Sequence, residues 1–347
     1  MSYLVGHWAT GHLGRQSLRA IIEHPDLELV GVVVGDHREA GLDAAELAGT
    51  GRRTGVLATA DPARLLALRP HVISHTACGR GRVVDEVCRI LESGAGVVTN
   101  ALPPKPSADP AAARRLRAAC ATGGAACLAT GPGPMTDMLP LLLSGASLHL
   151  DGIKITEVMC YARRAEVREF GFGGPIGHRP PVVRPGVPTL MWGPMIRLIA
   201  DQLAVPLDDF DETYELCPAP ESFDVPAGRI AKGTTAGLRF QVSGMLGGRP
   251  VITVEHVARL REDLAPHWPA PPFGEPGGHR VEIAGEPPWR LDVASPGAAD
   301  PSVPGTLATA LRLVNAIPAV AEARPGLHTP LTLPPFTGRR RLRRATR

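Results

Sequence analysis

The sequence predicts an α/β protein, with a doubly wound parallel sheet in its first part and a second α+β domain built on an open antiparallel sheet. Over residues 1–150, apolar strand patterns alternate with amphipathic helix patterns through short connections. This alternation is typical of right-handed βαβ units and a parallel sheet. After about residue 150, apolar residues instead alternate with polar ones, which is the period of half-exposed antiparallel strands.

The first part begins with a short strand, and a helix follows it with Leu13, Leu18 and Ile21 on one face. Pro25 ends this helix, because proline has no backbone N–H and clashes with the preceding turn. Further helices are expected near residues 84–91 and 111–122, where apolar residues recur at helical spacing. Strands are expected at residues 3–5, 27–34, 72–76, 96–99 and 125–129.

The second part begins with the alternating strand 153–158. Two hairpins are expected after it: 238–243 with 251–260 around Gly247-Gly248, and 280–284 with 290–293 around residues 286–288. Helices are expected near residues 190–203 and 306–320, and we expect the last one to pack back on the first domain.

Composition excludes several classes of protein. The 347 residues are 44% hydrophobic and 20% charged, as in ordinary globular chains. Neither a window of 18 apolar residues nor a signal-peptide pattern is found, so we expect a cytoplasmic protein without a membrane partner. The net charge is +3, but without the six arginines of the last ten residues it falls to −3. We therefore expect no nucleic-acid partner.

The cysteines and histidines show no metal-binding or disulfide pattern. The six cysteines form no CxxC pair, and the twelve histidines form no HExxH pattern. We therefore expect reduced thiols and no metal centre.

The strongest functional signal is the turn Gly6-His7-Trp8-Ala9-Thr10-Gly11-His12-Leu13-Gly14. It joins the first strand to the first helix, where glycines let a backbone approach a pyrophosphate and the helix N-terminus favours an anion. This is the pattern of a Rossmann-type dinucleotide site, and it predicts that Thr10, Gly11, His12, Leu13 and Gly14 contact the cofactor.

Residues after the second strand bear on the choice of cofactor. Asp36 is placed to accept hydrogen bonds from the ribose hydroxyls of NAD. Arg38, together with His37, is suited to the 2′-phosphate of NADP. Both kinds of group are present, so the sequence predicts NAD(P)H without choosing between the two forms.

Two stretches resemble dihydrodipicolinate reductases: residues 41–49 (GLDAAELAG) with Thr54-Gly55-Val56, and His75-Thr76-Ala77. The resemblance places Thr76 and Ala77 beside the nicotinamide ribose. Asn100 and Ala101, after the next strand, complete this group of cofactor-binding candidates.

Over most of its length the chain resembles the NAD(P)-dependent amine dehydrogenases that include 2,4-diaminopentanoate dehydrogenase. The matching stretches are His7-Trp8-Ala9-Thr10-Gly11, Thr130-Gly131-Pro132-Gly133, Gly171-Phe172-Gly173 and Leu313-Val314-Asn315-Ala316-Ile317-Pro318. The resemblance makes Asn315 a candidate hydrogen-bond partner of the nicotinamide carboxamide. It also implies that the second domains of two copies pair through one face of their sheets, which predicts a homodimer.

The sequence departs from both families at the catalytic residues. The His-His pair and the Lys-x-Asp-x-Pro-Ser-Gly-Thr run of dihydrodipicolinate reductases are absent, which excludes that activity. Amine dehydrogenases have an acidic residue after the strand equivalent to residues 97–99, but here no carboxylate precedes Asp109. Lys105 lies in this segment and is one candidate replacement, able to polarise a carbonyl or bind a carboxylate.

Three further residues are candidate proton donors or acceptors. Glu157 shares a strand face with Ile155 and Met159, and apolar surroundings would raise its pKa, as a general acid or base needs. Tyr161 follows the same strand. His178 follows the glycine-rich loop, and histidine is the side chain that most often serves as a general acid or base. Phe170, Phe172, Trp192 and Met195 are candidate walls of an apolar pocket.

The sequence thus predicts a dinucleotide-binding domain at 1–150 and a substrate and oligomerisation domain at 151–303. A C-terminal helix and strand follow at 304–336, and a solvated basic tail at 337–347. The expected function is hydride transfer to or from the C=N bond of a small, largely apolar substrate. Carbonyl reduction and a non-catalytic dinucleotide sensor remain the alternatives.

Overall fold

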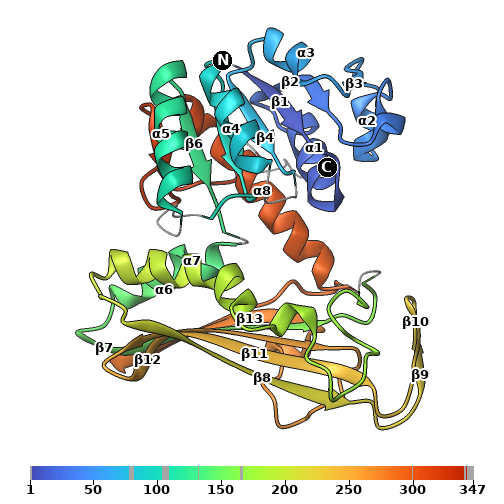
Figure 1. Cartoon of the computed structure of the whole chain (residues 1–347), viewed down its shortest axis with the longest axis vertical. Coiled ribbons are helices and arrows are strands. Elements are labelled where there is room, and N and C mark those ends of the chain that lie inside the picture. Colours follow the sequence, from blue (N-terminus) through green and yellow to red (C-terminus); the bar gives the residue numbers. More distant parts are fainter. Residues whose placement is uncertain are drawn as a thin grey trace, which may run out of the picture. The chain divides into compact units, whose positions relative to one another are not determined.

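The computed structural model describes residues 2–77, 82–103, 109–131, 133–164, 167–298, 300–339 and 341. The chain forms two compact units. Unit 1 comprises residues 1–133 and 306–347, and unit 2 comprises residues 134–305. Each unit contains its own sheet (Figure 1).

Unit 1 is built on a seven-stranded sheet in the order β15-β6-β5-β4-β1-β2-β3. All its strand pairs are parallel, which confirms the predicted doubly wound sheet. The strand order reverses between β1 and β4, and ligands bind at such a point, outside the carboxyl ends of the strands. The strands are β1 (Tyr3–Trp8), β2 (Leu27–Val33), β3 (Ala58–Thr59), β4 (Val72–His75), β5 (Gly96–Thr99), β6 (Ala126–Ala129) and β15 (Gly326–His328).

Helices cover both faces of this sheet (Figure 1). Helix α8 is long and apolar enough to cross a membrane by length and composition alone. However, its residues Leu313, Val314 and Ile317 are fully buried in a core cluster with Val5 and Val72 of the sheet. This face of α8 therefore forms part of the core of unit 1. The helices are α1 (His12–Ile22), α2 (Ala44–Ala48), α3 (Pro62–Ala67), α4 (Val83–Glu92), α5 (Pro110–Gly123) and α8 (Ser302–Ala321).

Asp43 organises the segment between α2 and β3. Its Oδ1 accepts hydrogen bonds from the backbone N–H groups of Ala45 (2.8 Å) and Thr54 (3.1 Å) and from the Thr54 hydroxyl (2.9 Å). Its Oδ2 accepts one from Gly55 N–H at 2.8 Å. These hydrogen bonds, first among them the one from Ala45, lower the pKa of Asp43 to about 2. The residues that resemble dihydrodipicolinate reductases thus form a capped turn.

Unit 2 contains a six-stranded sheet in the order β14-β13-β7-β12-β11-β8. The predicted hairpins are confirmed, since β11 pairs with β12 and β13 with β14, both antiparallel. The neighbouring strands β7 and β12 run parallel, so the sheet is mixed rather than wholly antiparallel. The strands are β7 (His149–Cys160), β8 (Asp209–Pro218), β11 (Thr235–Leu246), β12 (Arg249–Arg259), β13 (Gly277–Glu286) and β14 (Trp289–Val293), with a separate hairpin of β9 (Phe223–Val225) and β10 (Gly228–Ile230).

Helices α6 (Met138–Ser144) and α7 (Val187–Gln202) lie on one face of the six-stranded sheet (Figure 1). Helix α6 packs on β7 and β13. The boundary between the units therefore lies at residue 133, earlier than the expected residue 150.

The C-terminal residues return to unit 1. Strand β15 pairs with β6. In the tail, Arg341 donates a hydrogen bond to the Ala20 carbonyl of α1 at 3.3 Å, and Arg339 lies 3.7 Å from the Asp26 carboxylate. These described residues of the tail contact the folded unit, whereas the sequence predicted a solvated tail.

Candidate functional site

The glycine turn of unit 1 lies at the carboxyl end of β1. Gly11 is the N-cap of α1, and no side chain caps this end of the helix. The first backbone N–H groups of a helix have no partner within the helix and attract anions. His12 and Gly11 are exposed, so this terminus is accessible to a phosphate group.

The two glycines of the turn have different roles. A Cβ on Gly14 would lie 2.1 Å from the Ala9 carbonyl oxygen and 2.8 Å from the Thr76 hydroxyl, so only glycine fits there. A Cβ on Gly11 would meet nothing within 4 Å. Gly14 thus allows close packing inside the protein, while Gly11 faces open space where a pyrophosphate can approach.

A polar network ties this turn to the segment after β2. The Thr10 hydroxyl donates a hydrogen bond to Glu39, and the other oxygen of Glu39 lies 2.5 Å from the Arg15 guanidinium. Arg15 also donates to the Thr10 carbonyl at 3.1 Å and to the Leu47 carbonyl at 3.1 Å. The network fixes the turn, and neither Arg15 nor Glu39 was predicted from the sequence.

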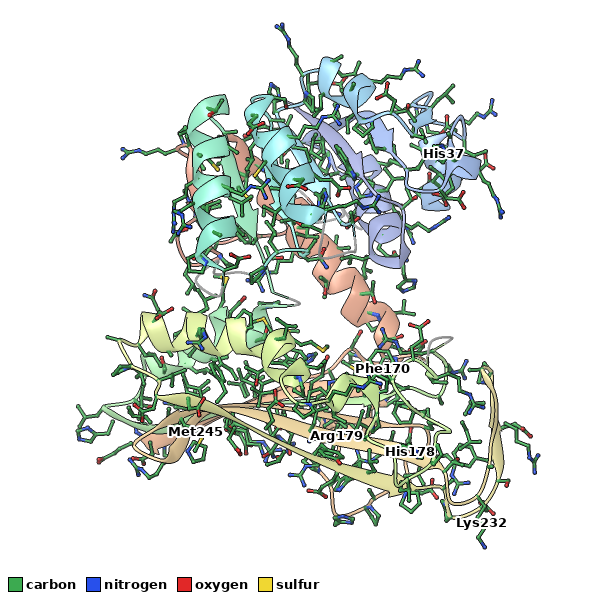
Figure 2. The ribbon with its side chains drawn as sticks, in the orientation of Figure 1. His37, Phe170, His178, Arg179, Lys232 and Met245 are labelled. Carbon is green, nitrogen blue, oxygen red and sulfur yellow. The ribbon has the colours of Figure 1, made fainter. Side chains whose placement is uncertain are left out.

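The cofactor-selecting candidates lie at the surface of unit 1. Asp36 accepts a hydrogen bond from the Arg38 backbone N–H at 2.9 Å and caps the short helix His37–Glu39. Asp36, His37 and Arg38 are all exposed, and Figure 2 shows His37 among the surface side chains. The Asp36 carboxylate and the Arg38 guanidinium, two positions apart in the sequence, are therefore both accessible at the surface.

The residues that follow β4 and β5 also lie at the carboxyl ends of the strands in unit 1. The Thr76 hydroxyl donates to the Ala9 carbonyl at 3.0 Å, so its side chain supports the glycine turn, with the half-buried Ala77 next to it. The Ala101 N–H donates to the Thr99 hydroxyl at 3.0 Å, and Asn100 is exposed. Lys105 lies outside the described residues.

Asn315 lies on α8, in the part of that helix that belongs to unit 1. Its side-chain oxygen is buried and has no hydrogen-bond partner among the described residues. Buried polar atoms are almost always paired in native proteins, so this oxygen points to a bound donor. The open space at Gly11, the uncapped helix terminus and this unpaired oxygen fit a dinucleotide.

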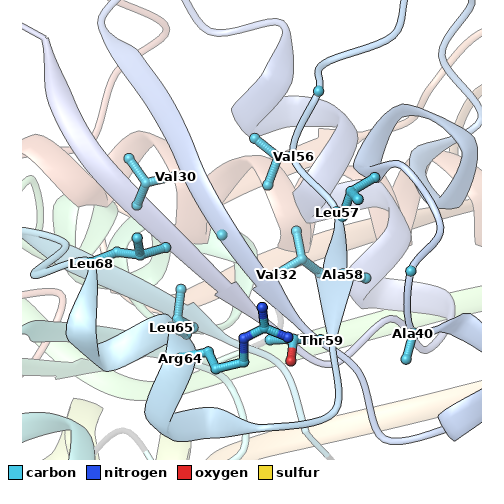
Figure 3. A pocket seen from close by; sticks show the side chains of 13 residues that line it. Val30, Val32, Ala40, Val56, Leu57, Ala58, Thr59, Arg64, Leu65 and Leu68 are labelled. Atoms are coloured by element: carbon cyan, nitrogen blue, oxygen red, sulfur yellow. The ribbon is translucent and has the colours of Figure 1, made fainter.

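Unit 1 also has a cavity of about 670 Å³ beside β2 and β3. It contains none of the cofactor-binding candidates. Figure 3 shows Arg64 of α3 pointing towards Thr59 across apolar side chains. The lining residues are Val30, Gly31, Val32, Ala40, Gly41, Gly55, Val56, Leu57, Ala58, Thr59, Arg64, Leu65 and Leu68.

In unit 2, Glu157 lies in a row of side chains that crosses three strands. His279 of β13 and His256 of β12 are its direct partners in the strand registers. His256 Nδ1 lies 2.7 Å from one oxygen of Glu157, and His279 Nε2 lies 3.3 Å from the other. The carboxylate is thus held between two imidazoles.

Tyr161 extends this row into the core. Its hydroxyl lies 3.1 Å from His256 Nε2, and its ring packs edge-on against Phe170 at 5.3 Å and Phe172 at 6.2 Å between centroids. The His256 ring lies between Trp192 and Phe240, at 6.4 Å and 5.2 Å. The structure therefore brings together two of the sequence candidates, Glu157 and Tyr161, and three of the predicted aromatic walls.

The expectation that apolar surroundings raise the pKa of Glu157 is wrong. Burial alone would raise it, but electrostatic attraction to His256 and hydrogen bonds with His256 and His279 outweigh burial and hold the pKa well below its usual range. Burial does raise the pKa of Tyr161, and the charge of Glu157 adds to this effect. Glu157 is therefore a fixed anion, and Tyr161 a neutral phenol.

His178 is not brought to this group. It is exposed, in the loop before α7, next to Arg179 (Figure 2). Arg179 stacks on Tyr214 of the edge strand β8, 4.4 Å from the ring centroid. Strand β8 is two strands away from β12, a distance of roughly 10 Å. Met195, the fourth predicted wall, is buried in the core cluster under α7.

The opposite face of the sheet holds a second buried carboxylate, Glu255. It lies 2.8 Å from Lys154 and 2.7 Å from Arg239, and it accepts hydrogen bonds from Gln241 and Thr156. Although burial opposes ionisation, these partners, first among them Lys154, lower its pKa to about 2. The charged groups of this network are paired with one another, which is typical of a structural role.

His256 and His279 were missed by the sequence analysis. His256 replaces an apolar residue in the alternating run Ile252, Val254, His256, Ala258, and this interruption is the signal that could have identified it. Nothing in the local sequence indicates that it faces Glu157, 99 residues away.

Comparisons with known proteins agree with this architecture. Residues 191–340 match the model of the 2,4-diaminopentanoate dehydrogenase C-terminal domain. The chain is similar to an amine dehydrogenase of Streptomyces virginiae, with 37% identity over 348 residues, 96% of this chain and 97% of that protein. It is 26% identical to a 2,4-diaminopentanoate dehydrogenase of Acetoanaerobium sticklandii, over 73% of this chain and 70% of that protein. The structure of an amine dehydrogenase from Mycobacterium smegmatis matches with a TM-score of 0.79 at 19% identity, covering 98% of each chain.

Proposed function

The chain belongs to the family of amine dehydrogenases that includes 2,4-diaminopentanoate dehydrogenase, and from this premise we propose that it interconverts a small, largely apolar amine with its imine or ketone. As a member of this family it is an NAD(P)-dependent oxidoreductase. When bound, the nicotinamide accepts hydride from the carbon next to nitrogen or returns it.

The residues that would hold the cofactor are those at the carboxyl edge of unit 1. The open backbone at Gly11 and the uncapped terminus of α1 would bind the pyrophosphate, with Thr10, His12, Leu13 and Gly14 forming the turn. Asp36, His37 and Arg38 would contact the adenosine ribose or its phosphate. The nicotinamide half would lie by Thr76, Ala77, Asn100, Ala101 and Asn315.

The observation that supports a catalytic role for unit 2 is the hydrogen-bonded row of Glu157, His256 and Tyr161. Amine oxidation needs a group that takes a proton from the substrate nitrogen, and ketone amination needs one that returns it. We propose that Tyr161 is this group. Phe170 and Phe172, which pack on its ring, would form an apolar wall around the substrate.

We further propose that the protein is a cytoplasmic homodimer, with no nucleic-acid or membrane partner. The face of the six-stranded sheet opposite α6 and α7 carries the Glu255 network and Glu215, whose side chain is 52% exposed. A second copy could cover this polar face. Light scattering after gel filtration tests this proposal: a mass twice that of the 36.6-kDa chain supports it, and the mass of one chain contradicts it.

The activity is tested by mixing the protein with NADH or NADPH and a panel of small ketones, with and without ammonium. We expect cofactor consumption that requires ammonium, and reduction of NAD⁺ or NADP⁺ by the corresponding amines. Consumption without ammonium would instead indicate a carbonyl reductase. Tight cofactor binding without turnover would indicate a sensor.

The variant Gly11→Asp tests the proposed cofactor site. A Cβ at this position would meet nothing within 4 Å, so the variant should fold. Its negative charge lies where the pyrophosphate would bind and should abolish cofactor binding. Turnover equal to that of the wild type would contradict the proposed cofactor site.

A further inference from the structure

Resting on the proposed amine oxidoreductase function, we propose that Tyr161, His256, Glu157 and His279 form one proton relay, with Tyr161 at the substrate end. In this relay Tyr161 is a catalytic residue, because it exchanges the proton with the substrate nitrogen. His256 accepts the proton that Tyr161 releases in exchange. Glu157 and His279 are positioning residues that act through His256.

The order of the relay follows from distances and exposure. The contacts run from Tyr161 to His256 (3.1 Å), from His256 to Glu157 (2.7 Å) and from Glu157 to His279 (3.3 Å). Tyr161 is 6% exposed, and the side chains of His256, Glu157 and His279 are 8%, 19% and 16% exposed. The chain of contacts therefore leads from a buried phenol to two groups that reach solvent.

The hydrogen bonds fix the direction of transfer. Glu157 is an anion, so His256 donates its Nδ1–H to it and leaves Nε2 as an acceptor. The Tyr161 hydroxyl then donates to Nε2, while the lone pairs of its oxygen remain able to accept. This arrangement suits a phenol that takes one proton and passes on another.

The transfer balances in atoms and charge. In the oxidative direction, an N–H bond of the substrate ammonium breaks and leaves its electron pair on nitrogen. That proton bonds to the Tyr161 oxygen as the Tyr161 O–H bond breaks, and the released proton bonds to His256 Nε2. The products are a neutral amine, which can lose hydride from its carbon, and an imidazolium ion paired with Glu157.

This route avoids a phenolate. Burial and the charge of Glu157 raise the pKa of Tyr161, while Arg164, whose guanidinium lies 4.6 Å from the ring centroid, opposes them only in part. In the proposed relay the phenol stays neutral throughout, because it gains one proton as it loses another. Among the described residues, Glu157 of β7, His256 of β12 and Arg164 of the following loop act directly on the phenol, and His279 of β13 is linked to it only through Glu157.

Aromatic packing holds the imidazole in place for this role. Trp192 of α7 stacks on the His256 ring with an angle of 29° between planes, and Phe240 of β11 lies on it at 35°. A ring fixed from two sides keeps both nitrogens aligned with their partners. Such fixed geometry is what efficient proton transfer requires.

The relay is tested by measuring kcat for amine oxidation between pH 6 and 10, together with the Kd of the cofactor. We expect Tyr161→Phe and His256→Gln each to lower kcat by about 100-fold or more, with little change in cofactor Kd. Glu157→Gln should lower kcat about 10- to 100-fold and move the acidic limb of the profile to lower pH. The limb moves because His256 loses its neighbouring negative charge. His279→Gln should have the smallest effect.

The control is His149→Gln, an exposed histidine at the start of the same strand as Glu157, which should behave as the wild type. If His256→Gln keeps kcat within twofold while Tyr161→Phe loses 100-fold, the relay is overturned and Tyr161 stands alone. If Glu157→Gln leaves the pH profile unmoved, its positioning role is overturned.

A second measurement separates failure of the relay from failure of the proposed function. The ¹⁵N chemical shifts of the His256 ring report its tautomer without any turnover. We expect Nδ1 to carry the proton in the wild type, with a change in the Nε2 shift in Tyr161→Phe and in the Nδ1 shift in Glu157→Gln. Shifts that do not respond overturn the relay, whereas absence of amine turnover with responsive shifts overturns only the proposed function.

Discussion

The proposed cofactor site of unit 1 consists largely of backbone at the ends of parallel strands, whereas the cluster of unit 2 consists of side chains from three strands. In unit 1, the turn 9–14 directly follows β1 and leads into α1. In unit 2, Glu157 and Tyr161 meet His256 from 99 and 95 residues away. A site made from one short segment depends on local chain geometry, while a site made from distant segments depends on strand register.

The largest expected effect on cofactor binding is at the glycine turn of unit 1. In Gly14→Ala the new methyl group would lie 2.1 Å from the Ala9 carbonyl oxygen, so the turn must move. We expect the cofactor Kd to rise at least 100-fold, which corresponds to about 3 kcal/mol, in a fluorescence titration. Gly11→Ala is the control for folding, because its methyl group meets no protein atom. An unchanged Kd in Gly14→Ala would contradict the view that the close packing of this turn shapes the proposed cofactor site.

The next effect concerns side-chain charge in unit 2. Glu255→Gln leaves Lys154 and Arg239 without their buried anion, and we expect a loss of about 4 kcal/mol in the free energy of unfolding by urea at pH 7. Because the folded-state pKa is lowered from 4.5 to about 2, the wild type should lose this stability as pH falls from 4.5 to 2. Glu262→Gln, at an exposed position, is the control and should change little. A variant as stable as the wild type would show that the network adds nothing.

The third prediction concerns His7, a buried side chain of strand β1 in unit 1. Its ring is fully buried, and burial lowers its pKa from 6.5 to about 4. The folded state therefore binds this proton more weakly than the unfolded state, so stability is complete above pH 6.5 and falls between pH 6.5 and 4. The expected loss is about 3 kcal/mol. His7→Gln should remove this part of the pH dependence in urea titrations, and an identical pH dependence in the variant would contradict it.

The smallest effect is in cofactor choice. Arg38→Ala removes the exposed guanidinium beside Asp36 and should weaken NADP⁺ binding about tenfold, or 1.4 kcal/mol, with little change for NAD⁺. Arg52→Ala, at another exposed position of unit 1, controls for the loss of one positive charge. If the binding of NAD⁺ and NADP⁺ weakens equally, Arg38 does not recognise the 2′-phosphate.

The same contrast explains what the sequence could predict. Strand β1, its glycine turn and α1 follow from local patterns, as does the hairpin at Gly247-Gly248. Strand β8 was missed because it is an edge strand, with Asp211, Thr213 and Glu215 exposed, and so lacks a clear apolar face. Helices α2 and α3 are too short to show helical periodicity.

Periodicity placed Glu157 correctly on the apolar face with Ile155 and Met159. It could not reveal the neighbours of that position, because the parallel pairing of β7 with β12 depends on the whole chain. The sign of the Glu157 pKa shift was therefore wrong: burial is visible in a strand pattern, but two histidines on other strands are not.

The division of unit 1 into residues 1–133 and 306–347 affects how the protein is made. Val5 and Val72 share their core with Leu313 and Ile317 of α8, so this apolar surface stays uncovered while residues 134–305 leave the ribosome. At 5–20 residues per second this lasts roughly 10–35 s. During that interval the first 133 residues are an incomplete domain that chaperones could bind, and truncation before α8 should yield an aggregating chain.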